Sequence, residues 1–291
     1  MNEGRWDERG WQEYEVASFA EFHKVLEDVE TQLPRALYGQ VLYRGQEKSR
    51  WDLKPGIGRY LQTYKNSGLS EKRILVEEWN LVRDFRRQAG AYLERMPKDG
   101  WEVWVLAQHH GIPTRLLDWT HSPLAALYFA VEKPSKDNED DDSAVWLLYL
   151  PKAVLPATEE RRPKAIAEAY GVSSSDPILP HPMDVKEVSA YMPGYEVPRV
   201  RAQLGIFTVH PHPTEPLQGS NLPDRARLYK VVVKNYAREQ IKRTLANYGI
   251  FRQTLFPDLA GLADSLRWQK IGVLENPAGE PTPEETESSP P

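Results

Sequence analysis

The sequence predicts an α+β protein in which short strands and helices interleave along the chain. Apolar segments of strand length, such as 144–150 and 228–234, alternate with longer segments whose apolar residues recur every three or four positions. These segments follow no regular strand–helix–strand order, and no glycine-rich phosphate-binding loop follows a predicted strand. We therefore expect an α+β fold rather than a doubly wound parallel sheet.

The composition is that of a globular protein. Of 291 residues, 40% are hydrophobic and 10% aromatic, which is enough to bury a sizeable core. The net charge of −5 argues against a broad phosphate-tracking surface, and the absence of cysteine excludes disulfides, thiolate zinc sites and a cysteine nucleophile. No apolar run approaches the roughly 18 residues of a membrane span, and the polar N-terminus does not resemble a signal peptide. We expect a cytoplasmic protein with no membrane partner.

Local signals divide the chain into an N-terminal entry segment (1–17), a main domain (18–271) and a disordered, acidic, proline-rich tail (272–291). Ser18 with Glu21 forms a capping-box pattern before the first helix. In the first half of the chain we expect a helix to Thr31, a strand at 41–43 ending in Arg44, a long loop at 46–69, and helices from Ser70 and over 101–109. After residue 130 we expect an acidic loop at 136–143, a strand at 144–150, and an irregular excursion at 151–198 with a short helix at 165–170. A strand pair or broken strand at 199–209, a strand at 228–234, and helices over 236–247 and 255–269 complete the domain.

Residues 108–130 form the stretch around which the rest of the chain is expected to be arranged. Pro113 keeps the residue before it out of helical geometry, so a helix ending near His110 should give way to a short strand at 114–117. The polar residues at 118–120 can hydrogen-bond the local backbone and turn it. A helix, a polar corner and a second helix in so few residues indicate a built site rather than a connector.

The second of these helices has a strong start signal. Ser122 is an N-cap residue and Pro123 occupies the first helical position. Capping also explains Ser122 better than a role as a hydrolase nucleophile, because the GxSxG elbow is missing. The side chains expected to face the core are Leu124, Leu127, Tyr128 and Val131.

His109, His110 and Asp118 are the residues that a metal site would use. Adjacent residues on a helix point about 100° apart and rarely bind one ion, and no HxH or HExxH spacing occurs. A polar network at a helix end is the more ordinary interpretation, and we expect no metal site.

Arg44 and Arg115 each lie beside an apolar strand segment, where an unpaired guanidinium would be costly. Such an arginine either pairs with a fixed carboxylate, such as Asp118, or binds an anionic ligand, and both alternatives stay open at this point. We predict that Arg115 is structural and pairs with a carboxylate, Asp118 being nearest in sequence, and that Arg44 faces a cleft.

These residues carry a resemblance to a known family. The tripeptide Tyr43-Arg44-Gly45, followed by HHGIPTRLLDWTHSPLAALYFA at 109–130, resembles the FRG domain, which is named for a Phe/Tyr-Arg-Gly tripeptide. The resemblance continues through QLGIFT at 203–208 and LFPDL at 255–259, and so covers roughly residues 20–270.

A second, more distant resemblance is to the ADP-ribosyltransferase fold. It is based on an arginine ending an early strand, a strand and polar corner before an apolar helix, and a late strand in the position of a catalytic acid. The resemblance implies a mixed sheet flanked by helices, with NAD as the substrate. Arg44 would bind the NAD ribose or phosphates, and Gln203 would occupy the catalytic glutamate position. The implied NAD-binding residues are Arg44, Gly45, His110, Asp118, Trp119, Thr120, Ser122 and Tyr128, with Thr120 and Ser122 bracing the site and Trp119 or Tyr128 facing the nicotinamide.

Gln203 departs from the transferase pattern because an amide cannot stabilise a cationic transition state as a carboxylate does. Glu196 or Asp118 could supply the acid instead, catalysis could be slow, or the domain could only bind. Gln203 could also be structural, with its side chain closing a backbone gap in the strand.

Three classes of function stay open. The first is an NAD-dependent ADP-ribosyltransferase that modifies a protein or nucleic acid, of the kind found among bacterial toxins and defence effectors. The second is a catalytically silent nucleotide- or partner-binding module of the same fold. The third is a metal-dependent hydrolase or nuclease built on His109, His110 and Asp118. The transferase class predicts that Arg44, residues 118–120 and Gln203 line one cleft.

Overall fold

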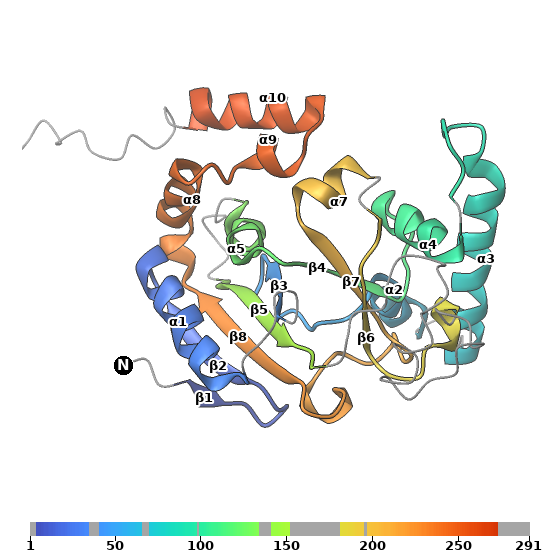
Figure 1. Cartoon of the computed structure of the whole chain (residues 1–291), viewed down its shortest axis with the longest axis horizontal. Helices are drawn as coiled ribbons and strands as arrows, with labels where there is room; N and C mark the ends of the chain where they lie inside the picture. The colour runs from blue at the N-terminus through green and yellow to red at the C-terminus, as the bar shows by residue number, and fades with distance from the viewer. Residues whose placement is uncertain are drawn as a thin grey trace, which may run out of the picture.

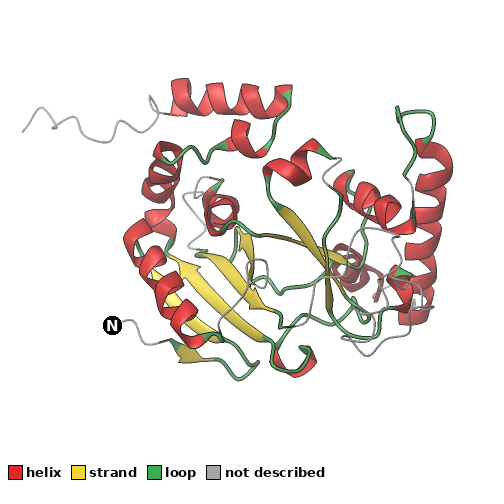
Figure 2. Cartoon of the chain, in the orientation of Figure 1, coloured by secondary structure: helices red, strands yellow, loops and turns green. Residues whose placement is uncertain are grey.

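A mixed sheet of eight strands runs through the protein in the order β1-β2-β8-β5-β3-β4-β7-β6. Figure 2 shows the strands with helices around them. The computed structural model describes residues 4–34, 41–65, 70–97, 99–133, 141–151, 181–194 and 197–272. The strands are β1 (Arg5–Trp6), β2 (Gln12–Val16), β3 (Val41–Gln46), β4 (Leu116–Thr120), β5 (Ser143–Tyr149), β6 (Ser189–Tyr191), β7 (Gly205–Val209) and β8 (Arg227–Val233). Only β2 and β8 pair in parallel among the described strands, so the sheet is mixed.

Helices cover the sheet and the α+β class is confirmed. The α-helices are α1 (Phe19–Gln32), α2 (Gly56–Lys65), α3 (Glu71–Ala89), α4 (Gly100–His109), α5 (Pro123–Val131), α7 (Pro198–Ala202), α8 (Arg238–Asn247), α9 (Arg252–Leu255) and α10 (Leu259–Arg267). Short 3-10 helices lie at η1 (Pro182–Asp184), η2 (Gly219–Asn221) and η3 (Asn235–Ala237), and a π-helix, η4 (Trp268–Gly272), follows α10. No helix within the described ranges is long and apolar enough to cross a membrane.

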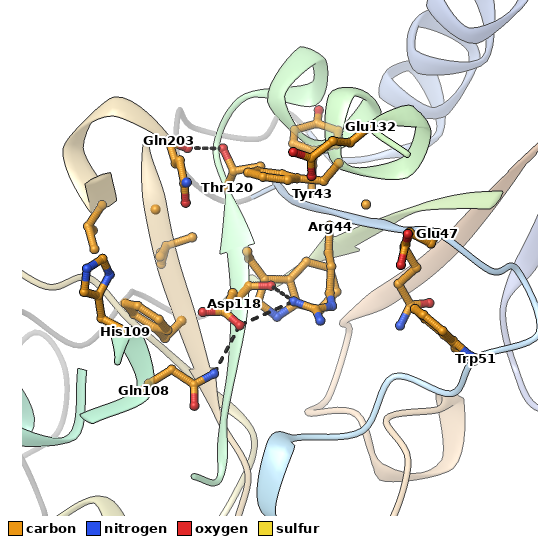
Figure 3. Close-up of a pocket in the computed structure, with 18 of the residues that line it drawn as sticks. Tyr43, Arg44, Glu47, Trp51, Gln108, His109, Asp118, Thr120, Glu132 and Gln203 are labelled. Atoms are coloured by element: carbon orange, nitrogen blue, oxygen red, sulfur yellow. Dashed lines mark hydrogen bonds and ion pairs between the residues drawn. The ribbon is translucent and has the colours of Figure 1, made fainter. Parts of the chain in front are cut away.

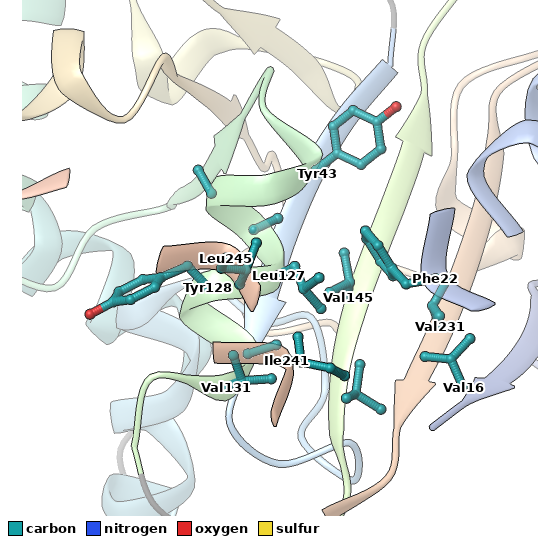
Figure 4. Close-up of a cluster of buried hydrophobic side chains, with 14 of the residues drawn as sticks. Val16, Phe22, Tyr43, Leu127, Tyr128, Val131, Val145, Val231, Ile241 and Leu245 are labelled. Atoms are coloured by element: carbon teal, nitrogen blue, oxygen red, sulfur yellow. The ribbon is translucent and has the colours of Figure 1, made fainter. Parts of the chain in front are cut away.

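One face of the sheet packs against α1, α5 and α8. Phe22 of α1 and Leu127 of α5 are fully buried and meet Val145 and Val231 of the central strands (Figure 4). Leu245 of α8 completes this cluster. The cluster explains why residues 123–131 are apolar on nearly every side, since α5 lies between the sheet and α8.

The other parts of the core hold the sheet from different sides. Leu42, Trp119 and Trp146 belong to a cluster on the opposite face of the central strands. A third cluster packs α3 and α4 against β4, β7 and β6, with Trp104 and Phe207 among its members. In Figure 1, α3 and α4 lie on the side of the molecule opposite α1 and α8. The strands β3 and β4 are therefore held by different layers of helices.

Several local signals are confirmed. Ser18 accepts a hydrogen bond from the Glu21 amide, and the Glu21 side chain accepts one from the amide of residue 17. Ser70 caps α3. Ser122 caps α5, with Pro123 at its first position. The strands at 144–150 and 228–234 are found as β5 and β8.

Other predictions are wrong. Residues 5–16 do more than lead into the domain, because β1 and β2 extend the sheet beside β8. The predicted loop at 46–69 contains α2, and residues 118–120 continue β4 instead of turning. The predicted strand at 199–209 begins as α7, β6 lies within the expected irregular excursion, and the last predicted helix is two helices, α9 and α10. The proposed helix at 165–170, residues 134–140 of the acidic region and residues 273–291 lie outside the described residues.

Candidate functional site

The sheet opens between β3 and β4. Their ladder contains one residue pair, Tyr43 with Thr120, whereas β3 pairs with β5 along its whole length. Beyond that pair, Nη1 of Arg44 donates a 2.6 Å hydrogen bond to the backbone carbonyl of Asp118. Because a carbonyl freed from a ladder needs a donor, the arginine side chain takes the place of a backbone amide in the gap.

The tripeptide 43–45 has a separate structural task at each position. The ring of Tyr43 is buried in the cluster beside α5. Gly45 lies directly beneath α5, where an added Cβ would overlap the carbonyl oxygen of Ala126 and lie 2.6 Å from the amide nitrogen of Ala130. Arg44, between them, faces the opposite side of the sheet and the gap beside β4. The glycine thus allows the helix to approach, and the alternation of the strand presents the arginine.

A cavity of about 740 Å³ lies in the gap. It lies within the size range of small-molecule sites. Arg44, Asp118, Thr120 and Gln203 all line it, so the prediction that these residues share one cleft is confirmed (Figure 3). Its remaining lining residues are Tyr43, Gly45, Gln46, Glu47, Trp51, Asp52, Lys54, Arg59, Gln108, His109, Trp119, Phe129, Glu132, Lys133, Arg199, Val200, Gly205, Ile206 and Phe207.

Cations outnumber carboxylates in this cavity. The cations are Arg44, Lys54, Arg59, Lys133 and Arg199, and the carboxylates are Glu47, Asp52, Asp118 and Glu132. Glu47 and Lys133 neutralise each other at 3.0 Å, and Glu132 pairs with Arg252, which does not line the cavity, so Arg44, Lys54, Arg59 and Arg199 face Asp52 and Asp118. The cavity therefore favours an anionic ligand.

The guanidinium of Arg44 is the most strongly desolvated of these cations. Its side chain is 15% exposed, and burial lowers its pKa, an effect to which Arg59 adds and which Asp118 opposes. The Nε atom of Arg44 has no hydrogen-bond acceptor among the described residues. This atom is itself inaccessible, so an anionic ligand would meet the remaining donors of the guanidinium and would offset part of the cost of burying its charge.

Asp118 is the carboxylate nearest to Arg44. Its Oδ2 lies 3.7 Å from Nη1 of Arg44 and accepts a 3.1 Å hydrogen bond from the Gln108 side chain. Gln108 is held in turn by the hydroxyl of Thr114 at 2.8 Å. The Asp118 side chain is 55% exposed, so it is oriented by Gln108 yet open to a ligand.

Gln203 lies at the end of α7 and not on a strand. Its backbone carbonyl accepts a 2.6 Å hydrogen bond from the hydroxyl of Thr120. Its side-chain amide donates to the carbonyl of Leu255 at 3.1 Å, which connects α7 to α9. Gln203 therefore has a structural contact, as the alternative interpretation allowed, but it closes a gap between helices. Its oxygen stays available on the cavity side.

Trp119 is held by a buried polar chain. Its Nε1 donates to the hydroxyl of Thr208 at 2.9 Å, and that hydroxyl lies 2.8 Å from Nε2 of His210. Burial, together with the nearby charges of Arg44 and Arg115, lowers the pKa of His210 to about 3. Because the Trp119 ring is buried, we assign it to the wall of the cavity and not to a free stacking surface.

Three residues that were expected in the site are not among the described residues that line the cavity. Ser122 caps α5, and Thr120 braces its backbone by accepting a hydrogen bond from the Ser122 amide. His110 ends α4 beside Phe85. Tyr128 lines a second cavity, between α5 and α10. Glu196 lies outside the described residues, so its expected role as an acid stays a prediction.

Arg115 is structural, as predicted, but its partner is different. Both its Nε and its Nη2 donate to Glu78, and the side chains are 2% and 0% exposed. Side chains alternate between the two sides of extended chain, so residues 115 and 118, three positions apart, point to opposite sides. Asp118 is therefore not the partner of Arg115. Glu78 is missed from the sequence because it stands among charged residues of an amphipathic helix, next to Trp79, which is exposed.

Sequence reasoning also misses Arg199, Lys133 and Glu132, which line the cavity from α7 and the end of α5. Arg199 is assigned to a strand from its apolar neighbours, so its direction cannot be predicted. His109 does line the cavity near Asp118, but no group of three residues of the metal-binding types could hold an ion within the described ranges.

Residues 39–139 match the family model described as the FRG domain. The matched range contains Arg44, Gly45 and the Asp118–Thr120 segment, but not Arg199 or Gln203. Neither a curated protein nor a solved structure matches the chain. The FRG resemblance seen in the sequence is therefore confirmed over residues 39–139.

Proposed function

We propose that the protein binds NAD in the cavity between β3 and β4 and transfers its ADP-ribose group to an acceptor. The observation that carries this proposal is Arg44, whose guanidinium lies almost buried in a cavity where cations outnumber carboxylates. A guanidinium fork suits the diphosphate of NAD, because it can donate two parallel hydrogen bonds to phosphate oxygens.

The chemistry needs little from the protein beyond placement and charge. In the proposed reaction, the bond between the nicotinamide nitrogen and ribose C1′ breaks, and its electron pair neutralises the departing nicotinamide. The acceptor nucleophile then bonds to C1′ and loses its proton. Positive charge develops on the ribose meanwhile, so a nearby carboxylate that holds the ribose hydroxyls would speed the reaction.

Asp118 is our candidate for that carboxylate. It is more exposed than Glu47 and Glu132, with a side-chain exposure of 55% against 24% and 18%, and its ion pair with Arg44 is longer, at 3.7 Å, than the pairs that those two acids make with Lys133 and Arg252. Gln203, whose amide is engaged with Leu255, would contribute its remaining oxygen to the ribose. The acceptor is a protein or a nucleic acid.

Nicotinamide release from NAD tests the proposal, since it reports on the donor half of the reaction even when water is the acceptor. We expect slow release by the wild type and none by Arg44→Ala. Asp118→Asn should lower release about 100–1000-fold without loss of binding, because Arg44 is bound by the backbone carbonyl of Asp118. Arg73→Ala, on the exposed face of α3, is the matched control and should release nicotinamide normally. Release by Arg44→Ala at the wild-type rate would exclude the proposal.

A silent nucleotide-binding module is the second candidate. It is favoured by one observation, namely that Gln203 stands where the transferase resemblance expects a glutamate and is engaged with Leu255. Calorimetric titration with NAD separates the two candidates. Binding that Arg44→Ala abolishes, without nicotinamide release by the wild type, would assign the silent module.

A further inference from the structure

We infer that the cavity contains a second anion-binding subsite, formed by Arg199 on the wall opposite β3, and that it receives the second phosphate of a nucleoside diphosphate. This inference deepens the proposed function and rests on it for the identity of the cavity as a ligand site. It concerns a part of the chain that lies outside the FRG match.

Arg199 is held by an aromatic ring and not by a carboxylate. Its guanidinium carbon lies 4.2 Å from the centre of the Phe256 ring. No described residue accepts a hydrogen bond from its side chain or lies within ion-pair distance of it. Stacking leaves the edge of a guanidinium free, so its N–H donors stay available for an anion in the cavity that Arg199 lines.

Other contacts hold the Phe256 ring in place. Phe256 is 6% exposed, and the guanidinium carbon of Arg252 also lies 4.2 Å from its centre. Arg252 is in turn paired with Glu132 of α5 and with Asp264 of α10, the latter at 2.7 Å. Phe256 is thus held by one cation that is neutralised by carboxylates and by a second cation, Arg199, that is not.

The backbone that carries Arg199 is fixed as well. The helix α7 is tied to β4 by the 2.6 Å hydrogen bond from Thr120 to the Gln203 carbonyl, and to α9 by the 3.1 Å bond from Gln203 to Leu255. The guanidinium of Arg199 is therefore already ordered in the folded protein before an anion binds, which lowers the entropic cost of binding.

The charges around Arg199 agree with this role. Burial lowers its pKa, and Asp118 and Asp258 oppose that effect from beyond ion-pair distance. On the same wall, burial and the charge of Arg199 lower the pKa of His109. A bound phosphate would relieve the repulsion between these two groups. The charge of Asp118 raises the pKa of both Arg44 and Arg199.

The test compares ADP with AMP as calorimetric probes, because the two differ by one phosphate. If Arg44 binds the first phosphate and Arg199 the second, the wild type should bind ADP at least about tenfold more tightly than AMP. Arg199→Ala should remove this preference by weakening ADP about tenfold while changing AMP less than about twofold. Arg201→Ala is the matched control, since Arg201 is exposed on the same short helix and does not line the cavity.

A second variant separates the subsite from general damage to the fold. Phe256→Leu keeps an apolar side chain but removes the buried aromatic ring under Arg199, so it should lower the melting temperature and, in the protein that stays folded, weaken ADP more than AMP. Equal loss of both probes in Arg199→Ala, or no ADP preference in the wild type, overturns the inference. Nicotinamide release is measured separately: its absence, with the ADP preference intact, excludes the transferase function and leaves the subsite standing.

Discussion

Arg115 and Glu78 form a buried ion pair that joins β4 to α3. The closest atoms, Nη2 and Oε2, lie 2.7 Å apart, and the backbone amide of Arg115 donates to the same carboxylate at 2.6 Å. The pair fixes the start of the strand that ends in the cavity with Asp118 and Thr120. The two arginines differ in role, because the carboxylate of Arg115 is buried and 2.7 Å away, whereas that of Arg44 is 55% exposed and 3.7 Å away.

Arg115→Ala should lower the free energy of unfolding by about 3–5 kcal/mol, since it leaves the Glu78 carboxylate buried without a partner. Chemical denaturation measures this loss. The control is Arg73→Ala, which breaks the exposed pair with Glu77 and should cost less than about 1 kcal/mol. Similar losses in the two variants would show that the buried pair does not hold α3 to β4.

Gly45→Ala should destabilise the protein by about 3 kcal/mol, because the added methyl group overlaps the backbone of α5. Gly100→Ala is a matched control, since nothing lies within 4 Å of a Cβ at that position and alanine favours the helix. Thermal unfolding of the two variants compares them directly. A stable Gly45→Ala protein would mean that α5 can move away from β3.

His210 should make stability depend on pH below neutrality. Its pKa in the folded protein, about 3, is below the ordinary value of 6.5, so the unfolded chain binds the proton more readily between these values. The stabilisation is present above pH 6.5 and is lost as pH falls toward 3, by at most about 1.4 kcal/mol per pH unit. Denaturation between pH 4 and 7 (a range of roughly three units) measures the slope.

His210→Asn removes this titration, so the difference between variant and wild type should shrink as pH falls. His212→Asn, at an exposed ring two residues later, should leave the wild-type slope unchanged. If the free energies of unfolding of His210→Asn and of the wild type changed equally with pH, His210 would not be the group that titrates.

Gln203→Glu should lower stability by about 1–3 kcal/mol, because the carbonyl of Leu255 loses its donor and faces a carboxylate instead. The same substitution at exposed Gln240 on α8 should change stability by less than about 0.5 kcal/mol. Equilibrium unfolding of both variants tests this. If Gln203→Glu is as stable as the wild type and releases nicotinamide faster, the residue is an active-site group without a structural contact.

Local signals in the sequence predict the ends of helices well and the contacts between distant segments poorly. Ser122 and Pro123 identify the start of α5 because capping involves only neighbouring residues. The position of Arg44 is predicted for a similar reason, as it is the polar residue within a short apolar strand. The fold class likewise follows from the order of apolar segments.

Residues of the site that depend on long-range packing cannot be found in this way. Glu78 looks like any surface residue of α3 until its contact with Arg115 is known. Arg199 stands directly before Val200, and Gln203 lies between Val200 and Ile206, an apolar spacing that is also compatible with a strand. The short helix α7 forms there because Thr120, Leu255 and Phe256 hold it, and none of these contacts is visible in local periodicity.

The parallel pairing of β2 with β8 has a consequence for how the protein is made. The neighbours of β3 and β4 in the sheet are β5 and β7, both of which follow residue 139, the end of the FRG match. On the ribosome, a nascent chain that stops there would therefore leave the outer edges of both strands without partners. β2, synthesised first, must wait for Arg227–Val233 to emerge before it can join the sheet. We expect the FRG segment to become protease-resistant only late in translation, after residue 233 has left the exit tunnel.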